Sequence, residues 1–196
     1  MAKQKQQKAS GRTQLETMLD VAIGVFLRYG FKKTSMDDVA GAVGLSRQGL
    51  YLHFKTKDHL FQAALEHLIS RSLAEARAIA TNQEMSVEER ILAVFAALHR
   101  DTLETASRAN ASELVEQSRS KGANLMKELE KGFVGIVTEL LTQSGIASRW
   151  RHAGITANQL ARHLFATASG IKASADSLAA YRAQMKIAIR IIGKGV

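Results

Sequence analysis

The sequence contains neither proline nor cysteine in its 196 residues. Proline removes a backbone hydrogen-bond donor and clashes with the preceding helical turn, so its absence leaves long helices uninterrupted. Without cysteine the chain forms no disulfide and has no thiolate chemistry, which fits a cytoplasmic protein. No run of about four to eight β-branched and aromatic residues stands between turn signals. We therefore predict an all-α protein without a sheet.

Long apolar runs are also missing. The longest, from Ile91 to Leu98, has eight residues, whereas a membrane-spanning helix needs about 20. The amino terminus is charged but no apolar stretch follows it, so we expect no signal peptide and no membrane partner.

Sequence signatures of enzymes and metal sites are absent as well. The chain has no phosphate-binding glycine loop, no dinucleotide-binding glycine motif, no metalloprotease helix motif and no serine-nucleophile elbow. Its six histidines are scattered, and none sits with the cysteine, histidine and carboxylate groups that a zinc site needs. We therefore expect no catalysis, no cofactor and no bound metal.

The net charge is +9, and the excess is concentrated toward the amino terminus. Residues 1–60 contain 10 Lys and Arg against 5 Asp and Glu, which is more than half of the excess. A basic domain is expected where a protein binds phosphates and releases their counterions. Residues 1–11 form a Gln-rich basic segment that we expect to be a disordered tail, either free or in contact with DNA.

Apolar residues recur at helical spacing along most of the chain. Gly30 and Gly145 end two of the predicted helices, and Ser86, Thr156 and Ser177 begin three others. The predicted helices span residues 12–29, 36–43, 47–53, 57–79, 86–106, 110–118, 121–142, 156–173 and 177–192, with a loop at 145–155.

Residues 34–57, TSMDDVAGAVGLSRQGLYLHFKTK, are the most informative segment of the chain. Ser35 and Asp38 fit a capping box that begins a short helix. Gly44 follows that helix, where a turn with positive φ costs glycine little. Ser46 is a good N-cap for a second short helix. The segment therefore predicts two short helices joined by a glycine turn.

The first turn of the second short helix exposes side chains that suit DNA. Arg bonds bidentately to guanine and Gln to adenine, and Arg47 and Gln48 occupy this turn. Gly49 lets the backbone approach a base or phosphate, while Tyr51 and His53 are stiff donors to phosphate oxygens. Each residue taken alone also has an ordinary structural interpretation, so the hypothesis rests on their common register.

In this register the segment from about Arg12 to Arg71 resembles the DNA-binding domain of the TetR family of bacterial transcriptional regulators. The matching residues are Ala22 to Phe26, Gly30-Phe31, Thr34-Ser35, Val39-Ala40, Gly44-Leu45-Ser46, Leu50-Tyr51, His53-Phe54, Lys57 and Leu60. One departure is Leu52, where many members carry a bulky polar or aromatic residue. The resemblance implies DNA contacts by Thr34, Ser35, Ser46, Arg47, Gln48, Gly49, Tyr51, His53 and Lys57.

The resemblance also implies a three-helix helix-turn-helix domain followed by a helical bundle. We expect the DNA-binding domain at residues 12–72, with its helix-turn-helix motif at about 35–54, and a ligand-binding and dimerisation domain at 73–196. The implied function is a sequence-specific regulator, a repressor that a small-molecule effector releases from a palindromic operator in double-stranded DNA. Two alternatives stay open: a ligand-sensing or protein-interaction module with a vestigial DNA-binding head, and a non-specific nucleoid protein.

The last two predicted helices carry apolar stripes. In residues 177–192 the apolar positions recur at spacings of three and four, which is typical of a packed helical seam. Burial inside the subunit and pairing with a second copy both explain such a stripe, and members of the family pair through their final two helices. The resemblance therefore implies a homodimer with an interface formed by Leu160, Leu164, Ala168, Ile171, Leu178, Tyr181, Met185, Ala188 and Ile192.

The resemblance further implies a pocket for an unidentified effector among the middle helices. Apolar residues with a few polar groups are typical of such pockets, although each candidate is also an ordinary core residue. Trp150 lies in a basic loop, where it either covers a pocket or anchors the loop. The candidate pocket residues are Phe95, Leu98, His99, Met126, Leu129, Phe133, Ile136 and Phe165.

Overall fold

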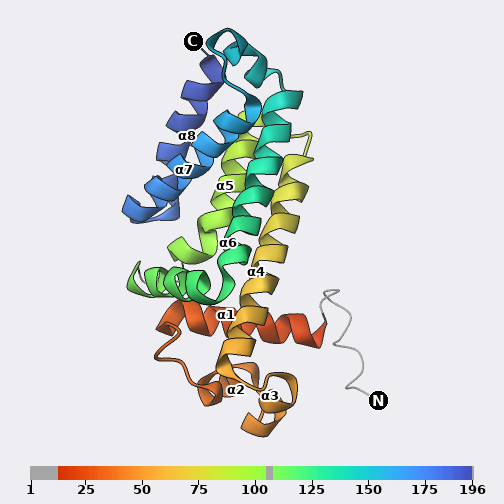
Figure 1. The fold of residues 1–196 in the computed structure, drawn as a ribbon, viewed down its shortest axis with the longest axis vertical. Coiled ribbons are helices and arrows are strands. Elements are labelled where there is room, and N and C mark those ends of the chain that lie inside the picture. The colour runs from red at the N-terminus through yellow and green to blue at the C-terminus, as the bar shows by residue number, and fades with distance from the viewer. Residues whose placement is uncertain (1–12, 105–107, 196) are drawn as a thin grey trace.

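The computed structural model describes residues 13–104 and 108–195, and within 108–124 only the backbone and Glu116. These residues form helices and no strand, which confirms the predicted all-α class (Figure 1). The basic tail predicted at 1–11 lies outside the described residues. The helices are α1 (Gln14–Tyr29), α2 (Met36–Val43), α3 (Arg47–His53), α4 (Lys57–Ala80), α5 (Val87–Glu104), α6 (Arg108–Gln143), the 3-10 helix η1 (Ile146–Ala153), α7 (Ala157–Ser174) and α8 (Leu178–Lys194).

The first three helices pack with the start of α4 at one end of the molecule, the lower end in Figure 1. Three phenylalanine rings close the centre of this small core. Phe26 meets Phe61 edge-on with ring centroids 5.2 Å apart, and the rings of Phe31 and Phe61 lie 5.0 Å apart. Aromatic pairs in such geometries add to the stability that apolar burial gives. We call this end, residues 13–56 with the first half of α4, the head.

The helix α4 belongs to both ends of the molecule. It starts in the head and continues beside α5 and α6, which form a bundle with α7 and α8 (Figure 1). Leu73 packs against the head core and the bundle core alike. The domain division predicted at 72–73 therefore falls inside a continuous helix and stays a prediction. Gly132 of α6 permits a close approach of α4, because a Cβ there would lie 2.5 Å from Leu73 Cδ2.

Two predicted features in the second half of the chain are wrong. The sequence pattern predicts separate helices at 110–118 and 121–142, but α6 is one helix. Ser120 between the two segments and Gly122 at the start of the second lower helix propensity by only about 1 kcal/mol or less each, and proline is absent. Figure 1 shows the first part of α6 lying across the molecule and the rest running beside α4. The loop predicted at 145–155 contains the 3-10 helix η1.

The η1 segment is fastened to the carboxy-terminal helix. The indole Nε1 of Trp150 donates a hydrogen bond of 2.9 Å to the carbonyl of Ile192. Next to it, the Arg149 side chain donates to the carbonyl of Gly193. Of the two roles considered for Trp150, covering a pocket or anchoring the loop, the structure shows the second.

Six of the nine residues predicted for a dimer interface are buried in the subunit's own core, so for these six the prediction is wrong, and for the three half-buried ones it stays a prediction. Apolar spacing identifies a buried helix face, but it does not say which chain covers that face. Here α8 packs against α5 of the same chain, and the Tyr181 hydroxyl donates to the Phe95 carbonyl at 3.3 Å. The buried residues of the set are Leu160, Leu164, Ala168, Tyr181, Met185 and Ile192. Half-buried against the same core are Ile171, Leu178 and Ala188.

Candidate nucleic-acid interface and effector cavity

The two short helices of the head are fixed at their ends by their own side chains. The predicted capping box is present: Ser35 Oγ accepts from the Asp38 N–H at 3.1 Å, and the Asp38 carboxylate accepts from the Ser35 N–H at 2.8 Å. Gly44 makes the turn with a φ of 80°. Ser46 Oγ accepts from the Gly49 N–H at 3.1 Å and caps α3. Local contacts thus set the angle at which α3 leaves α2.

The amino-terminal turn of α3 is open to solvent. Ser46, Arg47 and Gln48 are exposed, and Figure 1 places α2 and α3 at the end of the molecule opposite α7 and α8. Gly49 is half-buried, and a Cβ there would lie 3.3 Å from Ser46 Oγ, so glycine at this position serves the cap. His53 is exposed on the last turn. The bundle does not cover the face on which DNA contacts are predicted.

Arg47 has an acidic partner in this structure. Its guanidinium lies 2.9 Å from the Asp37 carboxylate and 5.6 Å from the centroid of the Tyr51 ring. Both charged side chains are more than half exposed, and such pairs contribute at most about 1 kcal/mol to stability. Asp37 therefore orients the Arg47 side chain, but the ion pair is weak enough for the guanidinium to exchange it for another partner. Sequence reasoning missed Asp37, although two neighbouring aspartates in a basic domain, only one of them needed for the capping box, were a signal.

Two predicted DNA contacts have structural roles in the head. The Thr34 side chain is only 2% exposed, and its hydroxyl donates to the Gly30 carbonyl at 2.7 Å. The predicted DNA contact of the Thr34 side chain is therefore wrong, because the α1–α2 connection buries it. Lys57 Nζ donates to the carbonyls of Phe31 at 3.0 Å and Thr34 at 3.1 Å, and lies 4.4 Å from the Phe31 ring centroid. These bonds use two of its three hydrogens, so a phosphate contact by Lys57 stays a prediction.

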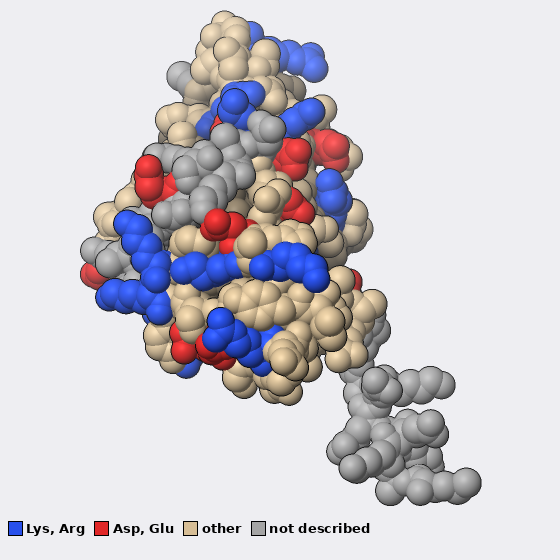
Figure 2. Space-filling view, turned by 60° about the horizontal axis from the view of Figure 1, so that its bottom comes forward, with Lys and Arg blue, Asp and Glu red and all other residues tan. Residues whose placement is uncertain are grey.

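Basic side chains gather around the exposed helix tip. Figure 2 looks toward the lower end of the molecule and shows Lys and Arg side chains running across this face, with a few acidic side chains among them. The exposed basic residues of the head are Arg28, Lys32, Lys33, Arg47 and Lys55. Such a surface attracts the phosphate backbone of a nucleic acid independently of its base sequence.

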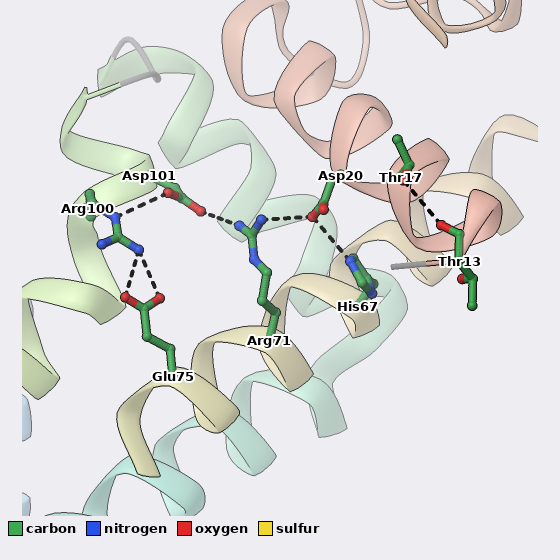
Figure 3. A network of polar contacts seen from close by, with 8 residues as sticks. All are labelled: Thr13, Thr17, Asp20, His67, Arg71, Glu75, Arg100 and Asp101. Atoms are coloured by element: carbon green, nitrogen blue, oxygen red, sulfur yellow. Dashed lines mark hydrogen bonds and ion pairs between the residues drawn. The ribbon is translucent and has the colours of Figure 1, made fainter. Parts of the chain in front are cut away.

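A chain of ion pairs joins the head to the bundle (Figure 3). Arg71 of α4 donates to Asp20 of α1 at 2.8 Å and to Asp101 of α5 at 2.7 Å. On the next turn of α4, Glu75 pairs with Arg100 of α5 at 2.8 Å. Arg71 lies 51 residues from Asp20 and 30 residues from Asp101 along the chain. No local sequence pattern connects groups so far apart, and the sequence reasoning did not find them.

A cavity of about 320 Å³ lies where the head meets the bundle. Residues of α1, α4, α5, α6 and α7 line it. Five of the eight predicted pocket residues are among them: Leu98, His99, Met126, Leu129 and Phe165.

The other three predicted pocket residues, Phe95, Phe133 and Ile136, are buried in the bundle core and are not among the described lining residues. For these three the prediction is wrong, because a core stripe and a cavity wall have the same apolar composition.

The head contributes a wall that sequence reasoning missed. Ile23 and Leu27 of α1, together with Phe61, Leu65 and Ile69 of α4, face this cavity. In the sequence they belong to the apolar stripes of their helices, so nothing separated them from core residues. Because α1 and α7 share one cavity, a molecule bound there would touch both the head and the bundle.

Polar residues also line the cavity, among them His99 and Lys172. His99 is 8% exposed, and its Nε2 has no hydrogen-bond partner. Burial, assisted by the charge of Lys172, lowers the pKa of His99 to about 3. Burial also lowers the pKa of Lys172 below its usual value of 10.5. Sequence reasoning missed Lys172, although a lysine that continues the apolar stripe of Phe165 and Ala168 was a signal.

Neither a metal site nor a membrane-spanning helix is found in the described part of the chain. Among the residues that the structure describes, no group of three or more His, Cys, Asp or Glu side chains is placed to hold a metal ion. Within the same residues, every helix is too short or too polar to cross a lipid bilayer.

The head matches a known protein family. Residues 18–64 match the model of the bacterial regulatory proteins of the tetR family. The HTH-type transcriptional repressor ComR of Escherichia coli is 34% identical over 94 residues, which are 46% of this chain and 45% of that protein. The HTH-type transcriptional regulator AcrR of Shigella flexneri is 38% identical over 66 residues, 34% of this chain and 30% of that protein. The chain thus spans less than half the length of these curated relatives.

Solved structures resemble the whole chain. A TetR transcriptional regulator from Legionella pneumophila has a TM-score of 0.71 at 18% identity, with 95% of this chain and 98% of that chain covered. The transcriptional regulator FadR from Bacillus subtilis, in complex with stearoyl-CoA, has a TM-score of 0.67 at 15% identity, with coverage of 93% and 99%. At these identities the likeness establishes the fold.

Proposed function

We propose that this chain, which belongs to the TetR family of bacterial regulatory proteins, is a sequence-specific DNA-binding repressor. In this proposal a small molecule lowers its affinity for its operator. The observation that carries this proposal is the exposed amino-terminal turn of α3. Ser46 caps a short helix that presents Arg47 and Gln48 away from the bundle, within a basic surface. A helix end of this kind fits the major groove, where the side chains of its first turn reach base edges.

The residues around this turn divide into readers and anchors. Arg47 and Gln48 have the side chains that bond bidentately to guanine and adenine. Ser35, Tyr51 and His53 flank them and suit phosphate oxygens, which position the protein without reading sequence. Asp37 keeps Arg47 in place before DNA binds, and the exchange of this exposed pair for a base or phosphate costs little.

Pairing of two copies would give the two heads that a palindromic operator requires. The faces of α7 and α8 that point away from the core carry apolar side chains, and in the single chain Ile187 is 60% and Ile191 is 62% exposed. Ala183 of α8 and the small residues Ala166 and Gly170 of α7 are exposed as well. Exposed apolar surface of this kind marks an interaction site. A two-fold pair with heads about 34–36 Å apart reads half-sites one helical turn apart.

The effector would act through the cavity between head and bundle. The Bacillus subtilis regulator of the same fold is in complex with stearoyl-CoA, which supports a ligand role for such a chain. A molecule that fills the space between α1 and α7 changes the position of the head relative to the pairing helices. To move the balance from 1:99 to 99:1, the effector must bind the released state about 10⁴-fold more tightly than the DNA-bound state.

Selection of bound sequences from random duplex DNA tests the proposal. We expect the full-length protein to enrich an inverted repeat, whereas an unpaired chain would enrich single half-sites. Gln48→Ala should relax preference at one base pair per half-site and cost about 1–3 kcal/mol of binding. The matched control is Gln83→Ala, an exposed glutamine outside the head. Equal binding to unrelated duplexes would instead support a nucleoid protein, and no binding at low salt would support a vestigial head.

A further inference from the structure

Among the residues that the structure describes, the positive charge of Lys172 in the cavity has no partner. Lys172 lines this cavity without a hydrogen bond or ion pair to any described residue. The two carboxylates in the lining both have arginine partners: Asp101 lies 2.7 Å from Arg71, and Glu130 lies 3.3 Å from Arg162. Burying an ammonium without a counter-charge is unfavourable, because the lost hydration is not replaced. The lining formed by the described residues therefore has an unmatched positive group.

A second unmatched donor lies close to the first. His99 Nε2 is buried and makes no hydrogen bond, and the charge of Lys172 acts on this imidazole. A neutral imidazole carries one N–H, which donates to an acceptor if that proton is on Nε2. Buried polar groups without partners are rare in folded proteins, and each calls for a ligand, a water molecule or a functional role. A buried imidazole nitrogen without a partner and a half-buried ammonium without a counter-charge, in one cavity, indicate the counterpart that they lack: an anion with at least two acceptor oxygens.

The apolar part of the cavity wall indicates the chemistry of the rest of the ligand. Most lining side chains are apolar, including Ile23 and Leu27 of α1, Leu65 of α4 and Leu98 of α5. The volume of about 320 Å³ lies at the small end of the roughly 300–1,000 Å³ found for ligand pockets. A compact hydrocarbon group fits the apolar part of this wall.

We propose that the effector is a small amphipathic carboxylate, with its two oxygens between Lys172 Nζ and His99 Nε2 and its hydrocarbon group against α1 and α4. This inference rests on the proposed function and names the ligand class for the same cavity. A carboxylate matches the two available donors with two oxygens and one negative charge, whereas a phosphate monoester would bring more charge and more acceptors than they satisfy. A neutral or cationic amphiphile would leave Lys172 unpaired.

Calorimetric titration of the full-length protein with three probes of equal chain length tests this inference. The probes are octanoate, octan-1-ol and octylammonium. We expect octanoate to bind at least about tenfold more tightly than octan-1-ol, which is the effect of one hydrogen-bonded charge, and octylammonium to bind most weakly. In Lys172→Met the preference for octanoate should disappear while octan-1-ol still binds. The matched control is Lys131→Met, which removes the same charge from an exposed position on α6.

Thermal unfolding of the same variants shows whether they are folded. Lys172→Met should have an unfolding midpoint equal to or above that of the wild type, because it removes an unpaired, largely buried charge. Octanoate that fails to bind, or a preference for octanoate that persists in Lys172→Met, would overturn the assignment of a carboxylate. Lys172-dependent binding of octanoate without loss of operator affinity would support the site and contradict the regulatory part of the proposed function. Operator recognition without any preference for octanoate contradicts the ligand class alone.

Discussion

At the scale of single residues, Lys57 shows how a DNA-binding motif is also a folding motif. From sequence alone, a lysine in the first turn of a helix predicts a phosphate contact. In the structure its ammonium ties α4 to the α1–α2 connection through the carbonyls of Phe31 and Thr34. The Phe31 ring beneath it adds a cation–π contact. Lys57 therefore holds the head together whether or not it also contacts DNA.

Replacement of the Lys57 side chain should destabilise the head, whether or not it also lowers the affinity for DNA. In Lys57→Met two carbonyl acceptors lose their partner, and we expect the free energy of unfolding in urea to fall by about 1–3 kcal/mol. The control is Lys55→Met, an exposed neighbour, where a change within about 0.5 kcal/mol is expected. If Lys57→Met unfolded like the wild type and lost only DNA affinity, a phosphate contact would be its main role.

At the scale of elements, local chemistry decides where α2 begins. The side-chain and backbone hydrogen bonds of Ser35 to the Asp38 carboxylate lower the pKa of that carboxyl below its ordinary value of 3.8. A carboxyl with a lowered pKa in the folded state stabilises that state above its unfolded pKa. The stabilisation is lost as the pH falls through the folded pKa. The part of the capping box that depends on the Asp38 charge therefore contributes fully at neutral pH, declines below the ordinary pKa and is lost below the folded pKa.

Ser35→Ala should remove both the cap and its pH dependence. We expect the Asp38 pKa, followed by carboxyl NMR titration, to rise toward 3.8 in this variant. The stability difference between wild type and variant should be constant near neutral pH and should shrink as the pH falls below that value. Glu84→Gln, an exposed change outside the head, should leave the Asp38 titration unchanged. An unaltered Asp38 pKa in Ser35→Ala would show that Ser35 does not set it.

How well an element can be predicted from sequence depends on how far apart in the chain the residues that determine it lie. The predicted bounds of α2 and α3 are confirmed at both ends, because Ser35, Gly44 and Ser46 act within one turn of chain. The buried faces of α7 and α8 could be found by spacing, but their partner could not, because Phe95 of α5 lies 86 residues away from Tyr181 in sequence. The cavity was predicted only in part for the same reason, since Lys172 and His99 line one cavity only after folding.

At the scale of the whole molecule, the head and the bundle are joined in two ways. The first is apolar: α1 and α4 form one wall of the cavity that α5, α6 and α7 complete. The second is the ion-pair chain of Asp20, Arg71 and Asp101, which joins α1 through α4 to α5 (Figure 3). Packed cores and such networks transmit a change of position because they have few alternative arrangements. Movement of the head in response to a ligand must therefore break or rearrange the ion pairs of Arg71.

Arg71→Met tests this connection because methionine preserves much of the apolar stem and removes the charge that joins Asp20 to Asp101. The three side chains are each about one-third exposed or less, so their pairing contributes more than a surface pair does. We expect amide hydrogen exchange in α1 to become roughly tenfold faster, as the loss of one charge-assisted hydrogen bond implies, while α8 keeps its protection. Arg77→Met, an exposed arginine in the last turn of α4, should change neither helix. Equal acceleration in α1 and α8 would mean that Arg71 supports global stability alone, and the route by which a cavity ligand moves the head would then run through the apolar wall.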